Sequence, residues 1–187
     1  MTNNLQNAEL FADLSNLSHS RSIIAIDGNA GAGKTTLAQQ LKEFFQNQDK
    51  SCQIINMDDL YAGWQNPFTI DLANRVITNV LLPFNQGIKA SYQVFDWNLN
   101  NFNKSKTLVI SDFLILEGVG SGQSAFRNLI DYLIWIEIDP AIGLQRVLKR
   151  DGSQHLEQMQ RFLIDQAAHF SIEQSKSAAD RVLISVP

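Results

Sequence analysis

Apolar and polar residues along this chain of 187 residues alternate in two periods, one typical of buried strands and one of amphipathic helices. Short apolar runs predict strands over 22–27, 52–57, 113–116, 132–138 and 181–186. Apolar positions spaced three or four apart predict helices over 5–17, 34–46, 69–82 and 140–150, and a longer, more polar helix, which could be broken, over 153–175. A looser alternation predicts a strand or hairpin arm over 90–97, with 107–110 as a candidate partner. Pro83 and Gly87 are expected to end the helix that begins at Thr69.

This order of elements predicts an α/β fold. Strands that alternate with helices favour a parallel sheet with right-handed crossovers, here a five-stranded core sheet with helices on both faces. The length suits one domain over residues 1–187, with a leading helix within 1–20 and a short lid and long helix over 151–175. Ligands of such sheets bind at the carboxyl ends of the strands, so functional residues are expected directly after strands.

Residues 28–35 read Gly-Asn-Ala-Gly-Ala-Gly-Lys-Thr and fit G-x-x-x-x-G-K-[ST], the phosphate-binding P-loop. The motif follows a predicted strand and opens a predicted helix, which is the context that its chemistry requires. Glycines let consecutive backbone N–H groups surround an anion, and the helix N-terminus adds a favourable dipole. Lys34 would reach the β- and γ-phosphates of ATP, and the Thr35 hydroxyl would bind Mg²⁺. The fold is therefore expected to be a P-loop NTPase three-layer sandwich, with a nucleotide site formed by Gly28, Asn29, Ala30, Gly31, Ala32, Gly33, Lys34, Thr35 and Thr36.

Carboxylates follow two other predicted strands. Asp58 and Asp59 are neighbours, so in extended backbone their side chains point in opposite directions and only one is expected to face the nucleotide. That carboxylate could accept a proton from a substrate hydroxyl or hold Mg²⁺. Glu117 ends the run 113–116 and is a second candidate ligand for Mg²⁺. The alternatives are solvated loop carboxylates and helix caps.

Cationic and aromatic residues supply further candidates. Arg146 and Arg150 are four positions apart on one helix face and could clamp a transferring phosphate, although a solvated basic face paired with Asp151 or Glu157 is the alternative. Aromatic side chains with one carboxylate could hold a planar base or a sugar ring, or could simply cover the edge of the sheet. The candidates in this set are Tyr61, Trp64, Tyr92, Phe95, Asp96 and Trp97. The spacing of His19, His155 and His169 does not suggest a metal site, and we interpret all three as surface or core residues.

Charge and composition narrow the partners. A formal net charge of −4 and a pI of about 5.3 argue against non-specific binding to nucleic acid, which needs a basic face. Cys52 is the single cysteine, so no intrachain disulfide can form. The first residues do not resemble a signal peptide, and no apolar stretch approaches the length of a membrane span. We expect a cytoplasmic protein without a membrane partner, and a homo-oligomer is compatible with the sequence.

Together these motifs resemble the uridine kinase-like branch of P-loop kinases, which includes pantothenate kinase and phosphoribulokinase, and most closely a compact bacterial subgroup. The resemblance extends over 23–184 and is carried by the P-loop, Asp58-Asp59-Leu60-Tyr61, Tyr92–Trp97, Glu117-Gly118, Arg146–Asp151 and Ala179-Asp180. It implies a base and Mg²⁺ role for Asp58 with Asp59 as the fallback, and a substrate-side role for Tyr61. Two features depart from the family pattern: residues 152–155 lack the arginines of a uridine kinase lid, and 92–97 lack a histidine after the tyrosine.

The resemblance implies Mg·ATP-dependent phosphorylation of a small-molecule hydroxyl, most simply that of a nucleoside. In this interpretation Lys34, Asp58, Arg146 and Arg150 are catalytic, Thr35, Asp58 and Glu117 hold the metal, and Asp59, Tyr61, Tyr92, Asp96 and Trp97 contact the substrate. A nucleoside monophosphate, a sugar or a vitamin precursor is an alternative acceptor. A nucleotide-binding switch or ATPase that transfers to water is the alternative from another class.

Overall fold

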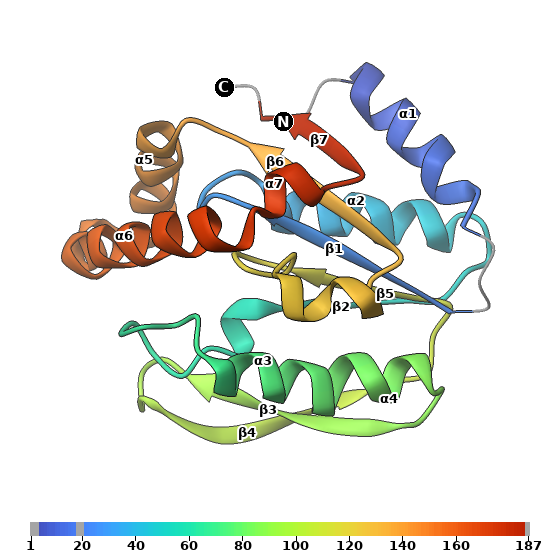
Figure 1. Cartoon of the computed structure of the whole chain (residues 1–187), viewed down its shortest axis with the longest axis horizontal. Helices are drawn as coiled ribbons and strands as arrows, with labels where there is room; N and C mark the ends of the chain where they lie inside the picture. Colours follow the sequence, from blue (N-terminus) through green and yellow to red (C-terminus); the bar gives the residue numbers. More distant parts are fainter. Residues whose placement is uncertain (1–3, 18–20, 186–187) are drawn as a thin grey trace.

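The computed structural model describes residues 4–17 and 21–185 and shows an α/β fold built on one parallel sheet (Figure 1). Its strands are β1 (Ser22–Gly28), β2 (Cys52–Asn56), β5 (Phe113–Glu117), β6 (Tyr132–Glu137) and β7 (Arg181–Ile184). They run parallel in the order β2-β5-β1-β6-β7. The predicted five-stranded core sheet is therefore confirmed, with each strand end within two residues of its expected place.

Alternate residues of β1 face opposite hydrophobic cores, because successive side chains of a strand point to opposite faces. Ile23 packs in one core with α3 (Ile70–Val76) and α6 (Leu156–Glu173). Ile24 and Ile26 pack in the other with α1 (Asn4–Ser15) and α2 (Lys34–Gln46). Helices thus cover both faces of the sheet, as predicted. Within the described ranges, no helix combines the length and the apolar character needed to cross a membrane.

The helix that begins after Thr69 continues through Pro83, so the predicted end at this proline is wrong. α3 passes into a π-helical segment, η2 (Ile77–Leu81), and then into α4 (Leu82–Asn85). Pro83 lies in the first turn of α4, directly after the widened π-helical segment, where a missing N–H is tolerated. Gly87 ends the helix as predicted, with a positive φ of 67° and its N–H bonded to the carbonyl of Phe84.

A separate antiparallel hairpin lies next to α3 and α4, on the side away from the main sheet (Figure 1). It consists of β3 (Ala90–Asp96) and β4 (Asn101–Leu108). The predicted partner 107–110 is wrong except at its first two residues, because β4 is almost entirely polar and exposed and leaves no alternation to detect.

The described segment after β6 contains three α-helices, two of which lie near the carboxyl end of the central strand. α5 (Pro140–Asp151) is followed by a short turn, η4 (Ser153–His155), and by α6. The break allowed for in the long helix occurs at Gln174, whose φ of 53° separates α6 from α7 (Ser175–Ala178). α5 and α6 thereby lie beside the carboxyl end of β1 (Figure 1).

Candidate functional site

The P-loop connects β1 to α2 at the carboxyl end of the central strand. Its three glycines all have positive φ, and at two of them a Cβ would lie within 2.3 Å of a backbone oxygen: Ile136 O for Gly28 and Gly143 O for Gly31. Only glycine therefore allows the loop to pack this closely against β6 and α5. Lys34 Nζ donates hydrogen bonds to the carbonyls of Gly28 (2.7 Å) and Asn29 (2.9 Å). Burial lowers the pKa of Lys34, and the carboxylates of Asp27, Glu117 and Asp58 oppose this shift.

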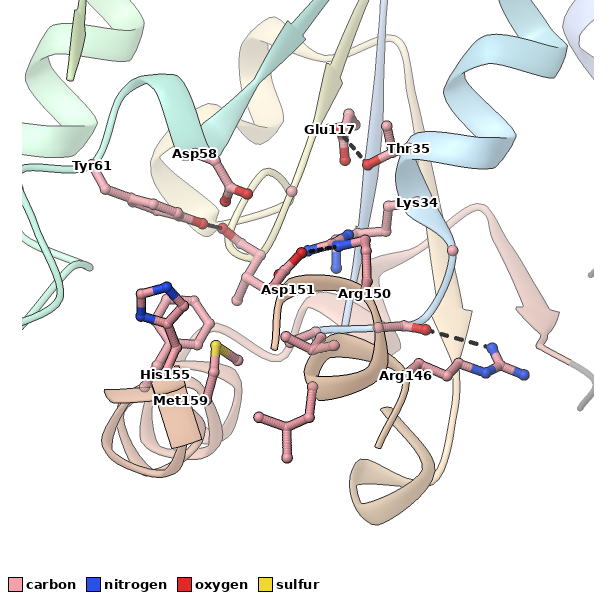
Figure 2. A pocket seen from close by; sticks show the side chains of 18 of the residues that line it. Lys34, Thr35, Asp58, Tyr61, Glu117, Arg146, Arg150, Asp151, His155 and Met159 are labelled. Carbon is pink, nitrogen blue, oxygen red and sulfur yellow. Dashed lines mark hydrogen bonds and ion pairs between the residues drawn. The ribbon is translucent and has the colours of Figure 1, made fainter. Parts of the chain in front are cut away.

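A pocket of about 400 Å³ opens beside this loop. Figure 2 shows Lys34, Thr35 and Arg146 on one side of it and Tyr61, His155 and Met159 on the other, with Asp58, Asp151 and Arg150 between them. The predicted nucleotide residues that line the pocket are Ala30, Gly31, Gly33, Lys34, Thr35 and Thr36. The two sides differ in chemistry, since one is cationic and the other is rich in aromatic and apolar groups.

Thr35 and Glu117 bring two oxygen atoms together at the phosphate side. Thr35 Oγ1 donates to Glu117 Oε1 over 3.0 Å, and Glu117 is 5% exposed. Burial raises the pKa of Glu117, while Lys34 and the Thr35 hydroxyl oppose this change. The described residues contain no group of three His, Cys, Asp or Glu side chains that could hold a metal by themselves. Mg²⁺ commonly takes one or two protein carboxylates together with phosphate oxygens, so this donor pair suits it.

The short turn η1 (Met57–Asp59) separates the two aspartates that the sequence left undecided. Asp58 projects into the pocket, whereas Asp59 lies outside it and forms an ion pair with Lys106 of the hairpin at 2.6 Å. Although Asp58 is open to the pocket, the surrounding protein removes much of its water and raises its pKa, with Lys34 and Arg150 acting in the opposite direction. Asp58 is therefore the carboxylate that faces Lys34.

The two predicted arginines line the same pocket in different ways. Arg150 lies near its centre and forms two hydrogen bonds, of 2.6 and 2.7 Å, with the neighbouring Asp151. Arg146 donates to Ser185 Oγ (2.8 Å) and to the Gly31 carbonyl (3.5 Å), and its guanidinium points away from Asp58 (Figure 2). Arg150 is thus the guanidinium placed between the two sides.

Two of the four remaining substrate-side candidates line the pocket. The buried Tyr61 donates its hydroxyl to the Val119 carbonyl over 2.6 Å. Trp97 donates its indole N–H to the backbone carbonyl of Asp58 over 3.0 Å. Tyr92 is instead buried between the hairpin and α3, outside the pocket. Asp96 also lies outside the pocket; it accepts two backbone N–H groups of the hairpin turn and pairs with Lys104, which supplies the partner its environment requires.

Of the two histidines that the structure describes, His155 is half-buried. Its ring lines the pocket and stacks against Trp64, with ring centres 6.1 Å apart and planes 24° apart. The signal in the sequence was its place four residues after Asp151, within the predicted lid. His169 is a core residue stacked on Phe68, as predicted, and His19 lies outside the described residues.

Asp27 is a buried carboxylate behind the pocket that the sequence analysis does not single out. Its carboxylate accepts backbone N–H groups from Gly28 (2.8 Å), Gly120 (2.9 Å) and Gly122 (2.9 Å). It therefore ties the start of the P-loop to the loop that follows Glu117. Burial raises the pKa of Asp27, and the three N–H groups and Lys34 oppose this. The feature of the sequence that marks Asp27 is an acidic residue at the end of an apolar strand.

Gln166 of α6 is a second buried polar residue that the sequence analysis does not single out. Its side-chain oxygen accepts the N–H of Ala30 (2.9 Å), and its nitrogen donates to Asn29 Oδ1 (3.0 Å). The glutamine is 2% exposed. It holds the outer part of the P-loop, and this contact spans 136 positions of sequence, so no local pattern marks it.

Replacing Asp27 with asparagine is expected to lower the free energy of unfolding by about 1–3 kcal/mol. Both carboxylate oxygens accept N–H groups, so an amide in either orientation would direct its own N–H₂ at a backbone donor. Urea unfolding of Asp27→Asn measures the loss. Asp49→Asn, at an exposed position of positive φ, is the matched control, and equal stability of the two variants would contradict the role of Asp27.

Residues 26–126 match the model of a family described as conserved hypothetical ATP binding proteins. The chain belongs to this family. The match begins in β1 and includes the P-loop, Asp58 and Glu117. This match confirms the predicted resemblance to the uridine kinase-like P-loop kinases at the level of the family. The relatives and solved structures described next confirm it as well.

The relatives include the uridine kinases of Brevibacillus brevis, 27% identical over 144 residues, and Chlamydia pneumoniae, 30% identical over 145 residues. Each alignment covers 69% of this chain, which spans 65% and 63% of the two relatives. A solved structure of a possible uridine kinase from Bacillus stearothermophilus superposes with a TM-score of 0.72 at 18% identity, covering 95% of this chain and 96% of that one. A D-glycerate 3-kinase from Cryptococcus neoformans superposes with a TM-score of 0.54 at 13% identity, covering 90% and 87%. These two structures show that the fold is shared.

Proposed function

We propose that this protein catalyses the Mg·ATP-dependent transfer of a phosphoryl group to a hydroxyl of a small molecule in the cytoplasm. The observation that carries the proposal is the position of Asp58, which faces the pocket between the P-loop side and an aromatic side. A carboxylate placed there can orient an acceptor hydroxyl and accept its proton, which is the part of phosphoryl transfer that a nucleotide site alone does not supply.

The other site residues divide the remaining tasks. Lys34 and the loop over 28–36 would bind the phosphates, and Arg150 would neutralise charge on the transferring group. Arg146, whose guanidinium donates to Ser185 Oγ and the Gly31 carbonyl, would support the P-loop in its place beside α5. Thr35 and Glu117, helped by Asp58, would hold Mg²⁺, which supplies charge neutralisation between the phosphates when bound. Lys34, Thr35, Asp58, Glu117 and Arg150 all line the pocket.

The acceptor classes under consideration are a nucleoside, a nucleoside monophosphate, a sugar and a vitamin precursor. The relatives named uridine kinase make a nucleoside the reference acceptor. Because the chain spans only about two thirds of those relatives, their substrate is a starting point for the experiment on this protein.

ADP release from Mg·ATP, measured against a panel of these four acceptor classes, tests the proposal. We expect release to depend on one hydroxyl compound and to be slow in its absence, since the proposed site would use Asp58 to orient an acceptor hydroxyl. Phosphorus NMR of the product should then show the new phosphate ester. ADP release at an equal rate with and without every acceptor would instead identify an ATPase.

A further inference from the structure

The turn η1 carries Asp58 and is too short to fix its own direction. Two backbone hydrogen bonds close it, both to the carbonyl of Met57 (2.8 and 3.2 Å). A single 3₁₀ turn is weak, because ordering its backbone yields few hydrogen bonds. With three residues per turn, Asp58 and Asp59 project in different directions, and rotation of the turn would move Asp58 away from Lys34. The direction of Asp58 therefore depends on contacts from outside the turn.

Two backbone carbonyls at this turn accept hydrogen bonds from side chains of the hairpin and of α3. Trp97, directly after β3, donates its indole N–H to the carbonyl of Asp58 over 3.0 Å. Arg75 of α3 donates from Nη2 to the carbonyl of Leu60 over 2.9 Å. The guanidinium of Arg75 also lies over the ring of Phe102 in β4, 5.0 Å from its centre, so it is held between the turn and the hairpin. The backbone is thus fixed at two points, which leaves the turn little freedom to rotate.

The hairpin is shaped to present Trp97 to the turn. Pairing of β3 with β4 shifts its register between Val94 and Phe95, two residues before Trp97. An irregularity of this kind bends a strand and redirects the side chains that follow it. The Asp96 carboxylate then accepts the two backbone N–H groups that follow Trp97, over 3.1 Å each, and so holds the hairpin turn. Since the indole also packs against Trp64, with 4.9 Å between ring centres, its N–H is held in place on several sides.

The ion pair between Lys106 and Asp59 is a weaker contact of the hairpin with the same turn. Both side chains reach solvent, with exposures of 53% and 19%, and exposed pairs of this kind contribute little to stability. The bonds to the two backbone carbonyls are therefore expected to hold the turn. Removing the charge of Asp59 should leave Asp58 in place, whereas removing the indole N–H of Trp97 should not.

We propose that Trp97 is a positioning residue for the base. Its indole N–H, together with Arg75, holds η1 so that the Asp58 carboxylate faces Lys34. The effect of Trp97 on the rate rests on the proposed kinase activity, whereas its effect on the turn does not. The hairpin of β3 and β4, which adds no strand to the main sheet, is on this assignment the element that directs the carboxylate into the pocket.

Kinetics of Trp97→Phe, which keeps a ring at this position and removes the N–H, tests the assignment. With the fastest compound of the acceptor panel we expect kcat to fall about tenfold and KM for ATP to stay unchanged, because a misplaced reacting group slows the chemical step. Arg75→Met, which frees the second carbonyl, should act in the same direction. Trp135→Phe is the matched control: its indole N–H bonds to Glu137 outside the pocket, so kcat should stay near that of the unmodified protein.

Hydrogen exchange of the free protein separates this assignment from the kinase activity. The N–H groups of Leu60 and Tyr61, which bond to the carbonyl of Met57, report on the turn. They should exchange about two- to tenfold faster in Trp97→Phe, the effect of one net hydrogen bond, and at an unchanged rate in Trp135→Phe. Faster exchange in a protein whose unmodified form transfers no phosphate supports the hold on the turn and refutes the kinase alone. Equal exchange in the two variants, or faster exchange with kcat unchanged, would overturn the positioning role.

Discussion

Replacing Asp58 with asparagine should lower kcat for phosphoryl transfer by a factor of about 10²–10⁴, the usual contribution of a positioned general base. The side chain keeps its shape but can no longer accept a proton from the acceptor hydroxyl. Binding of Mg·ATP should weaken far less than kcat falls, because Lys34, Thr35, Glu117 and the P-loop N–H groups remain in place and the asparagine keeps one oxygen for Mg²⁺. Rapid-quench measurement of phosphoryl transfer, together with ATP titration by calorimetry, separates the two effects.

Asp59→Asn is the matched control for this change. It removes a neighbouring carboxylate that lies outside the pocket and pairs with Lys106, so kcat should stay near that of the unmodified protein. Full turnover in Asp58→Asn would refute the base role. A large loss in Asp59→Asn with none in Asp58→Asn would transfer the role to Asp59, the fallback that the sequence offered.

The pattern of strands and helices could be predicted because the central strands β1, β5 and β6 are buried on both faces along most of their length and therefore read as nearly continuous apolar runs, whereas the edge strands β2 and β7 are partly exposed. β1, with each of its seven residues buried, is the clearest case. The strand-end rule predicts that the P-loop, Asp58 and Glu117 lie at one edge of the sheet, and all three line one pocket.

Features that depend on contacts distant in sequence could not be predicted in the same way. β4 is held by pairing with β3 and not by burial, so its sequence carries no strand period. Gln166 and Asp27 act through backbone N–H groups, which any residue type offers, so the sequence does not identify their partners. The choice between Asp58 and Asp59 depends on the direction of one tight turn, η1, which the sequence does not specify; in the structure Asp59 points to Lys106 on the hairpin, far along the chain.

Replacing Arg150 with glutamine should lower kcat/KM for phosphoryl transfer by a factor of about 10²–10³, comparable to losing one preorganised donor to a developing charge. Arg150 lines the pocket between its two sides, where its guanidinium pairs with Asp151 and is near enough to Asp58 and Glu117 to interact with their charges. Lys149→Gln removes the adjacent cation of the same helix, which is exposed and does not line the pocket, and should leave kcat/KM close to that of the unmodified protein. Equal losses in the two variants would mean that only the net charge of α5 matters.

The pH profile gives Arg150→Gln a second signature. Asp58 must be ionised to accept a proton, and burial raises its pKa, so activity should fall as the pH drops through a value above the ordinary range of an aspartate. Arg150 favours the ionised carboxylate and thereby keeps that pKa lower. Removing the guanidinium should therefore move the acidic limb of the kcat/KM profile to higher pH, whereas Lys149→Gln should leave it in place. A limb that stays fixed in Arg150→Gln would show that Arg150 acts on the phosphates alone, without electrostatic contact with the base.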